Sequence, residues 1–119
     1  MVNNQSVNKW DIWYCSLDPT EGSEQHGKRP VLVISNDAVN THLNICCVLP
    51  ITSVKADTVV HRTEVFLPMN ISGLHKDSLV LSHQIRTVSH ARLISRLSKL
   101  TDEEYRKKIL SVCRELIEY

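Results

Sequence analysis

The segment from Gly22 to Pro30 collects side chains that can handle a phosphate group. It reads Gly-Ser-Glu-Gln-His-Gly-Lys-Arg-Pro, which supplies a carboxylate, an amide, an imidazole and two cations. Arg29 stands before Pro30, where we expect a strand to begin, and a guanidinium held there offers a planar fork to phosphate oxygens. The alternative is a solvated hairpin loop in which Glu24 and Arg29 pair with each other. Composition alone favours this alternative.

A second feature is the stretch from Ser78 to Thr101, which contains no acidic residue. Its cations and histidines are Arg86, Arg92, Arg96, Lys99, His83 and His90. The chain as a whole has a net charge of only +1, so any attraction to nucleic acid must be local. The stretch predicts either a basic groove that follows a nucleic-acid backbone or a solvated face, with equal weight.

The six histidines add acid–base chemistry, because an imidazole titrates near neutral pH. Nothing nearby in the sequence orients four of them, which favours surface or structural roles: His42, His61, His75 and His90. His26 and His83 remain candidate acids or bases.

The four cysteines show neither a C-x-x-C pair nor a His/Cys ligand spacing, so we expect reduced, mostly buried thiols and no metal or other cofactor. The polar residues 1–9 contain no apolar stretch, which argues against a secretory leader or a membrane anchor. We therefore expect a cytoplasmic protein, with a frayed tail over 1–9 and one domain over 10–119.

Short apolar and β-branched runs predict the elements that position these side chains. We expect strands at 10–17, 30–35, 45–51, 64–67, 78–85 and 93–97, a short helix or loop at 36–44, and a loop at 54–63. Pro30 should occupy the first position of its strand.

The last segment predicts an amphipathic helix. Thr101 and Glu104 form a capping box with Thr101 as the N-cap. The apolar face behind it consists of Tyr105, Ile109, Val112, Cys113 and Leu116. The fold class is then β-dominated α+β, a small curled antiparallel sheet or barrel with a C-terminal helix.

Four sequence blocks carry a family resemblance. They are W-D-I-W-Y-C-S-L-D-P-T-E-G-S-E-Q-H-G-K-R-P-V-L-V-I-S-N-D from Trp10, L-P-I-T-S at 49–53, L-H-K-D-S at 74–78 and H-Q-I-R-T-V at 83–88. Together they resemble the MazF/PemK (Kid) toxins. The resemblance implies a CcdB/Kid/MazF-like, SH3-like barrel and a homodimer. It also implies a metal-independent, sequence-specific endoribonuclease for single-stranded RNA, the toxin of a type II toxin–antitoxin system, which a cognate antitoxin neutralises.

The resemblance also assigns roles to residues. The implied catalytic residues are Arg29, Thr52 and Glu24, and the implied RNA-binding residues are Ser23, Gln25, Lys28, Ser53, Gln84 and Arg86. Attack by a ribose 2′-OH would leave a 2′,3′-cyclic phosphate or 3′-phosphate and a 5′-OH. Two alternatives stay open: a non-catalytic toxin of this fold that poisons DNA gyrase, and a degenerate member that only binds RNA or antitoxin.

Three positions depart from the family pattern. Trp10 stands where the family usually has glycine, His26 replaces a small or polar loop residue, and His83 replaces the aspartate before Gln-Ile-Arg. The chain has few aromatic side chains for stacking RNA bases, and we expect Trp10, Trp13 and Tyr14 to lie in the core or a dimer interface.

Overall fold

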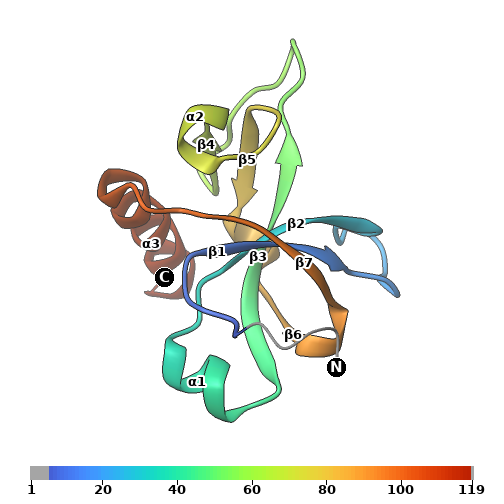
Figure 1. Ribbon diagram of the computed structural model, residues 1–119. Helices are drawn as coiled ribbons and strands as arrows, with labels where there is room; N and C mark the ends of the chain where they lie inside the picture. The colour runs from blue at the N-terminus through green and yellow to red at the C-terminus, as the bar shows by residue number, and fades with distance from the viewer. Residues whose placement is uncertain (1–5, 119) are drawn as a thin grey trace.

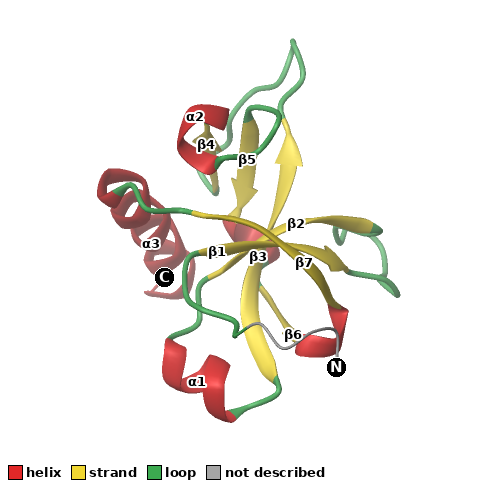
Figure 2. Cartoon of the chain, viewed as in Figure 1, coloured by secondary structure: helices red, strands yellow, loops and turns green. Residues whose placement is uncertain are grey.

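One antiparallel sheet forms the framework of the fold, with helices at its margins (Figures 1 and 2). The computed structural model describes residues 6–118. The strands are β1 (Asp11–Ser16), β2 (Lys28–Val33), β3 (Ile45–Ser53), β4 (Glu64–Leu67), β5 (Ser78–Leu81), β6 (Arg86–Ser89) and β7 (Leu93–Lys99). The helices are α1 (Asp37–His42), α2 (Met69–Ser72) and α3 (Glu103–Glu118), with 3-10 turns η1 (Ser82–Gln84) and η2 (His90–Arg92).

The strand order is β4-β5-β3-β2-β1-β7, and β6 pairs with β3 outside this path. The long strand β3 is the hub, because one part pairs with β2 and β6 and the other with β5. The two end strands, β4 and β7, do not pair with each other in the described part of the chain, so the sheet is curled but open. The expected β-dominated α+β class is confirmed, as a curled sheet and not as a closed barrel.

Two prolines lie where β3 changes its pairing partners. Pro50 lies between the part of β3 that pairs with β6 and the part that pairs with β5, so its missing N–H removes no bond from either ladder. The β2–β3 ladder ends at the pair Val31–Pro50, and the next residue on β2 is Pro30, which has no N–H to donate. Beyond this point β2 and β3 separate. The strand begins at Lys28, so the prediction that Pro30 is its first residue was wrong.

The segment expected as one strand from 78 to 85 is divided. β5 ends at Leu81, the turn η1 follows, and β6 begins at Arg86. The reason is that β5 and β6 pair with different parts of β3, so the chain must shift along β3 between them. The short helix α2 and the strand β6 were not predicted.

Helix α3 packs against the outer side of the sheet through Ile109 and Cys113, which are buried. Its cap differs from the prediction, because the Asp102 carboxylate, not the Thr101 side chain, accepts from the Tyr105 N–H at 3.1 Å. Leu116 is 39% exposed, so its expected place on the buried face was also wrong.

The expected N-terminal tail falls partly outside the described residues, which begin at 6. Within them, Val7 is buried in the core cluster that contains Trp13. The Asn8 N–H donates to the Asp11 carboxylate at 2.9 Å. Val7 and Asn8 are therefore part of the packed structure, contrary to the prediction of a tail over 1–9. No helix within residues 6–118 is long and apolar enough to cross a membrane.

Candidate functional site

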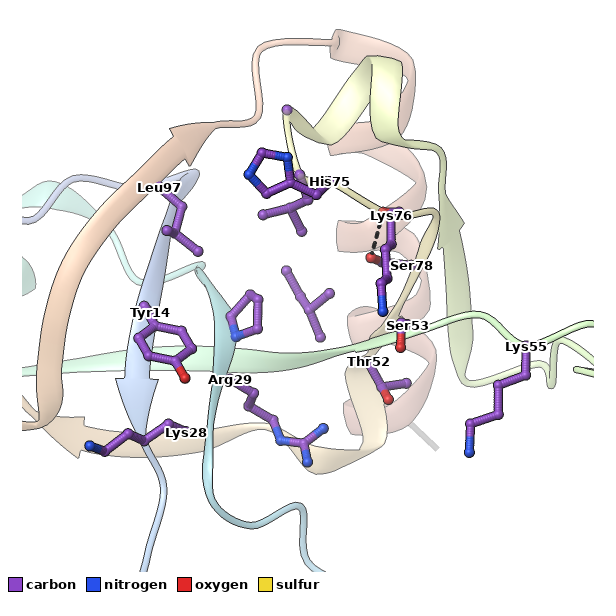
Figure 3. A pocket seen from close by; sticks show the side chains of 14 residues that line it. Tyr14, Lys28, Arg29, Thr52, Ser53, Lys55, His75, Lys76, Ser78 and Leu97 are labelled. Atoms are coloured by element: carbon purple, nitrogen blue, oxygen red, sulfur yellow. Dashed lines mark hydrogen bonds between the residues drawn. The ribbon is translucent and has the colours of Figure 1, made fainter.

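A cavity of about 620 Å³ opens where β2 and β3 separate (Figure 3). Arg29 reaches it from β2 and Thr52 from β3, and both side chains are half-buried. The other lining residues are Tyr14, Lys28, Pro30, Ile51, Ser53, Lys55, Gly73, Leu74, His75, Lys76, Ser78 and Leu97. We call this the strand cavity.

Ladders fix both principal residues of the strand cavity. Arg29 pairs with Cys15 of β1, and Thr52 pairs with Leu79 of β5. The Arg29 Nε donates to the carbonyl of His26 at 2.9 Å, which leaves the outer guanidinium nitrogens for an anion. The structure thus places Arg29 on a strand and not in the preceding loop, and brings it to the same cavity as Thr52.

The charged side chains that line the strand cavity are all basic. Besides Arg29 its lining includes three lysines and a histidine, Lys28, Lys55, Lys76 and His75, and none of the described lining residues is acidic. A one-sign cavity raises the local concentration of an anionic substrate. The sequence pattern missed Lys55, His75 and Lys76, although His75 and Lys76 lie in the L-H-K-D-S block.

Tyr14 does not lie in the core, one of the two places expected for it. It is half-buried and lines the strand cavity, whereas Trp10 and Trp13 are buried in the core as expected. Trp10 has a φ of 76°, a left-handed conformation that glycine adopts without strain, which fits the glycine usually found there in the resembled family.

A smaller cavity of about 200 Å³ lies between the β1–β2 loop and the segment from η1 to the start of β6. Its lining residues are Glu24, Gln25, Pro50, His83, Gln84, Ile85 and Arg86, and we call it the loop cavity. Glu24 and His83 are exposed. The residues singled out from the sequence therefore divide: Lys28, Arg29, Thr52 and Ser53 line the strand cavity, whereas Glu24, Gln25, His83, Gln84 and Arg86 line the loop cavity. Ser23 and His26 line neither of the two.

Side chains from the acid-free stretch hold the β1–β2 loop by its backbone. The Gln84 amide accepts from the Gln25 N–H at 3.3 Å and donates to the Ser23 carbonyl at 3.1 Å. Arg86 donates to the Leu17 carbonyl at 3.1 Å. Arg92 donates to the carbonyls of Ser16 and Asp18. These bonds fix the loop that carries Glu24 and leads into Arg29.

The remaining cations of that stretch bind within the protein. Arg96 and Lys99 lie 3.2 and 3.5 Å from the buried Asp11 carboxylate. The four cations that suggested a basic groove, Arg86, Arg92, Arg96 and Lys99, therefore all have partners within the protein. The basic surface lies instead at the strand cavity. Among residues 6–118 no ion pair joins Glu24 and Arg29, so the alternative of a solvated hairpin loop closed by this pair is not observed.

His83 has one hydrogen-bond partner among the described side chains. The His83 Nδ1 lies 2.9 Å from the Thr63 hydroxyl.

The cysteines are not disulfide-bonded, and three of them are buried. All four cysteines are free, and burial raises the pKa of Cys15 to about 11 and that of Cys46 to about 12. Burial also raises the pKa of Cys113. Because a thiol attacks as its thiolate, these three cysteines do not serve as nucleophiles at neutral pH.

Comparisons with known proteins agree with the geometry. Endoribonuclease EndoA of Bacillus subtilis (strain 168) is 35% identical over 115 residues, which cover 95% of this chain and 98% of that protein. The crystal structure of MazF from Deinococcus radiodurans superposes with a TM-score of 0.82 at 21% identity, covering 98% of this chain and 100% of that one. An endoribonuclease solved in complex with its cognate antitoxin, from a mycobacterial species, gives a TM-score of 0.73 at 19% identity, covering 94% and 95%.

The two solved structures establish the fold. The family model described as PemK-like, MazF-like toxin of type II toxin–antitoxin system matches residues 8–116, which is nearly the whole chain. This chain belongs to the PemK-like, MazF-like toxins of type II toxin–antitoxin systems.

Proposed function

We propose that this toxin is a sequence-specific endoribonuclease that cleaves single-stranded RNA at the strand cavity and thereby stops translation. The observation that carries the proposal is the meeting of Arg29 and Thr52 in one cavity surrounded by cations. Relatives named as endoribonucleases support it, at 35% identity in one case. The alternatives, a gyrase poison and a degenerate binding protein, require neither residue in this arrangement.

In the proposed reaction the ribose 2′-OH gives its proton to a general base and attacks the neighbouring phosphorus. The bond from phosphorus to the 5′-oxygen of the next nucleotide breaks, and this oxygen takes up a proton from solvent. Negative charge develops on the non-bridging oxygens, where the Arg29 guanidinium and the Thr52 hydroxyl donate hydrogen bonds. Lys28 and Ser53 at the cavity edge bind the flanking backbone. The products are an RNA ending in a 2′,3′-cyclic phosphate, or a 3′-phosphate after hydrolysis, and an RNA beginning with a 5′-OH.

The general base comes from the loop side. Glu24 is our first candidate, because the structure gives Arg29 another orienting partner, the His26 carbonyl, and leaves the carboxylate available for proton transfer. One Glu24 oxygen accepts from the Glu21 N–H at 2.6 Å, which holds the carboxylate in place. His26 and His83 are the titratable alternatives. If either ring acts as the base, the cleavage rate falls when that ring is replaced.

The proposal is tested by incubating the purified protein with a pool of long single-stranded RNA, with and without EDTA, and sequencing the new ends. We expect discrete cuts at a short recurring sequence, 5′-OH and cyclic-phosphate ends, and equal rates with chelator. Loss of activity in EDTA would contradict the metal-free mechanism. Intact RNA together with trapped gyrase–DNA complexes would favour the gyrase poison, and intact RNA without them the degenerate protein.

The proposal includes partners and a place of action. A cognate antitoxin neutralises the toxin by covering the strand cavity, consistent with the relative solved with its antitoxin. The protein acts in the cytoplasm, where its RNA substrates are, and as a homodimer. The exposed Leu43, which follows α1, and Ile45, the first residue of β3, are apolar surface that a second copy would cover. Sedimentation of the wild type and of Ile45→Lys tests this assembly, and a wild-type monomer would contradict it.

A further inference from the structure

The strand cavity has an apolar part that a phosphate group does not need. Five apolar or aromatic residues line it: Tyr14, Pro30, Ile51, Leu74 and Leu97. They come from four strands and from the loop after α2. A phosphate gains hydrogen bonds and charge from Arg29 and its neighbours but nothing from these side chains. An unpaired nucleobase is flat and aromatic, and stacks on such surfaces.

A β-bulge sends Leu97 toward the cavity. In the β1–β7 ladder Trp13 pairs with Arg96 and Ile12 pairs with Ser98, so Leu97 has no cross-strand partner. Its side chain is 44% exposed although it is apolar. Bulges next to binding sites change the direction of a side chain in this way. Leu97 and Tyr14 thus face the same space from adjacent strands (Figure 3).

The loop after α2 closes one side of the cavity. Gly73 has a φ of 77°, and a Cβ on it would lie 3.1 Å from the Cβ of Ser98. The Ser98 hydroxyl donates to the Ser72 carbonyl at 2.6 Å. The close approach of Gly73 and this hydrogen bond hold the loop against β7. Leu74 and His75 are thereby kept at the cavity, and Figure 3 shows His75 there.

We infer that this apolar part is a subsite for one unpaired nucleobase adjacent to the phosphate held by Arg29, with Tyr14 as its stacking platform. The inference rests on the proposed cleavage of RNA. Charge supports RNA as the occupant, because Lys55, His75 and Lys76 surround the cavity and can bind the phosphates on either side of the inserted base. The aromatic platform that the sequence analysis did not find is therefore Tyr14.

The test measures RNA binding in the absence of cleavage. The probes are oligonucleotides of about ten nucleotides that span a mapped cut site and carry a 2′-O-methyl group at the attacking ribose. A series removes one base at a time. Dissociation constants are measured by fluorescence anisotropy for the wild type, Tyr14→Leu and Tyr14→Phe, and for Leu97→Ala beside its control Leu116→Ala. Leu116 is an exposed leucine of α3 that lines neither cavity.

We expect Tyr14→Leu to weaken binding about 5- to 150-fold, the range of base–aromatic stacking, and Tyr14→Phe to bind like the wild type. One abasic position next to the cut should weaken wild-type binding to the same degree and have no further effect on Tyr14→Leu. Such non-additivity does not arise from general loss of structure. Leu97→Ala should bind more weakly than Leu116→Ala.

The subsite would be overturned if Tyr14→Leu binds RNA as tightly as the wild type. It would also be overturned if removing a base weakens binding by the same factor in Tyr14→Leu as in the wild type at every position. If the wild type binds RNA without cutting it, the proposed function fails, and the same Tyr14 comparison on single-stranded homopolymers still decides the subsite. If it binds no RNA, both fail. If Tyr14→Leu weakens only binding of an acidic peptide from the antitoxin, the occupant is a protein side chain and the inference is wrong.

Discussion

The strand cavity and the loop cavity are held in place by different means. The strand cavity is built on ladders, with Arg29 and Thr52 half-buried on paired strands. The loop cavity presents Glu24 and His83 from exposed positions, and side-chain hydrogen bonds to the backbone, two from Gln84 and one from Arg86, help to hold the loop that carries Glu24. Residues that must bind a fixed anion thus lie on rigid backbone, whereas the candidate proton carriers lie on backbone that side chains can release.

This difference has a physical consequence. A strand pair is stabilised by several cooperative backbone bonds, so one substitution at Thr52 or Arg29 leaves the cavity in place. The loop depends on about 1 kcal/mol from each side-chain bond, so one substitution at Gln84 can move it. Substitutions in the two regions should therefore differ in kind: those in the strand cavity remove chemistry, and those at the loop loosen geometry.

The largest effect is expected from Arg29. Arg29→Ala should lower the single-turnover cleavage rate about 100- to 1000-fold, because it removes a charged donor from the developing phosphoryl charge. Arg86 is also an arginine, but its hydrogen bond goes to the loop backbone. Arg86→Ala should therefore lower the cleavage rate by only about tenfold. Circular dichroism should show both variants folded. Equal losses in the two variants would erase the proposed distinction between the cavities.

The core behind the strand cavity should lose stability in alkali. Unfolded thiols titrate near pH 9, whereas burial raises the pKa of Cys15 to about 11 and that of Cys46 to about 12. The folded protein therefore binds more protons above pH 9, and the free energy of unfolding falls from there up to the folded pKa, by about 1.4 kcal/mol per pH unit and thiol.

Urea unfolding between pH 7 and 11 measures this slope. Cys46→Val removes one thiol, so the fall above pH 9 should be shallower than in the wild type by that amount. Lysine and tyrosine titrations affect both proteins alike and cancel in the difference. Parallel curves would mean that the Cys46 thiol is not protected by burial.

Gln84 should affect rate more than stability. Gln84→Met removes both bonds to the loop backbone and should lower kcat about tenfold, with KM changed less because the strand cavity is intact. Proteolysis within residues 20–27 should become faster in this variant. Gln84→Glu keeps the acceptor for the Gln25 N–H but loses the donor to Ser23, so its rate should lie between the two. Thr87→Val, on the neighbouring strand, is the control. An unchanged proteolysis rate in Gln84→Met would refute the clamp.

The smallest effect is expected at the helix cap, far from both cavities. Asp102→Ala removes the acceptor for the Tyr105 N–H and should lower the free energy of unfolding by about 1 kcal/mol, without changing the cleavage rate. Thr101→Ala should change neither quantity. Thermal unfolding of the two variants checks this, and a larger loss in Thr101→Ala would restore the capping box predicted from the sequence.

The elements that the sequence predicted well are those with strong local signals. The apolar run of β2 and the helical period around Ile109 and Cys113 correspond to observed elements, because β2 is buried on both faces and α3 is buried on one. The break of the expected 78–85 strand at Ser82 was not predictable locally, since it follows from the pairing of β5 and β6 with different parts of a third strand. The sequence patterns also could not show that Leu97 is bulged.

The site was predictable only in part for the same reason. Arg29 and Thr52 were assigned through the family resemblance, and the structure brings them together. Gln84 and Arg86 were assigned to RNA by position in a motif, whereas their hydrogen bonds go to loop backbone. Tyr14 alternates with core residues along β1, so its sequence context could not distinguish the core from a cavity wall.

The most direct test of the strand cavity is the single-turnover cleavage rate of Thr52→Val. Valine keeps the shape of threonine on β3 but removes the hydroxyl donor. The account predicts a rate at least about 100-fold below the wild type, with the RNA dissociation constant and the unfolding curve essentially unchanged. A wild-type cleavage rate in this variant would show that RNA is not cut at the cavity that Thr52 and Arg29 share.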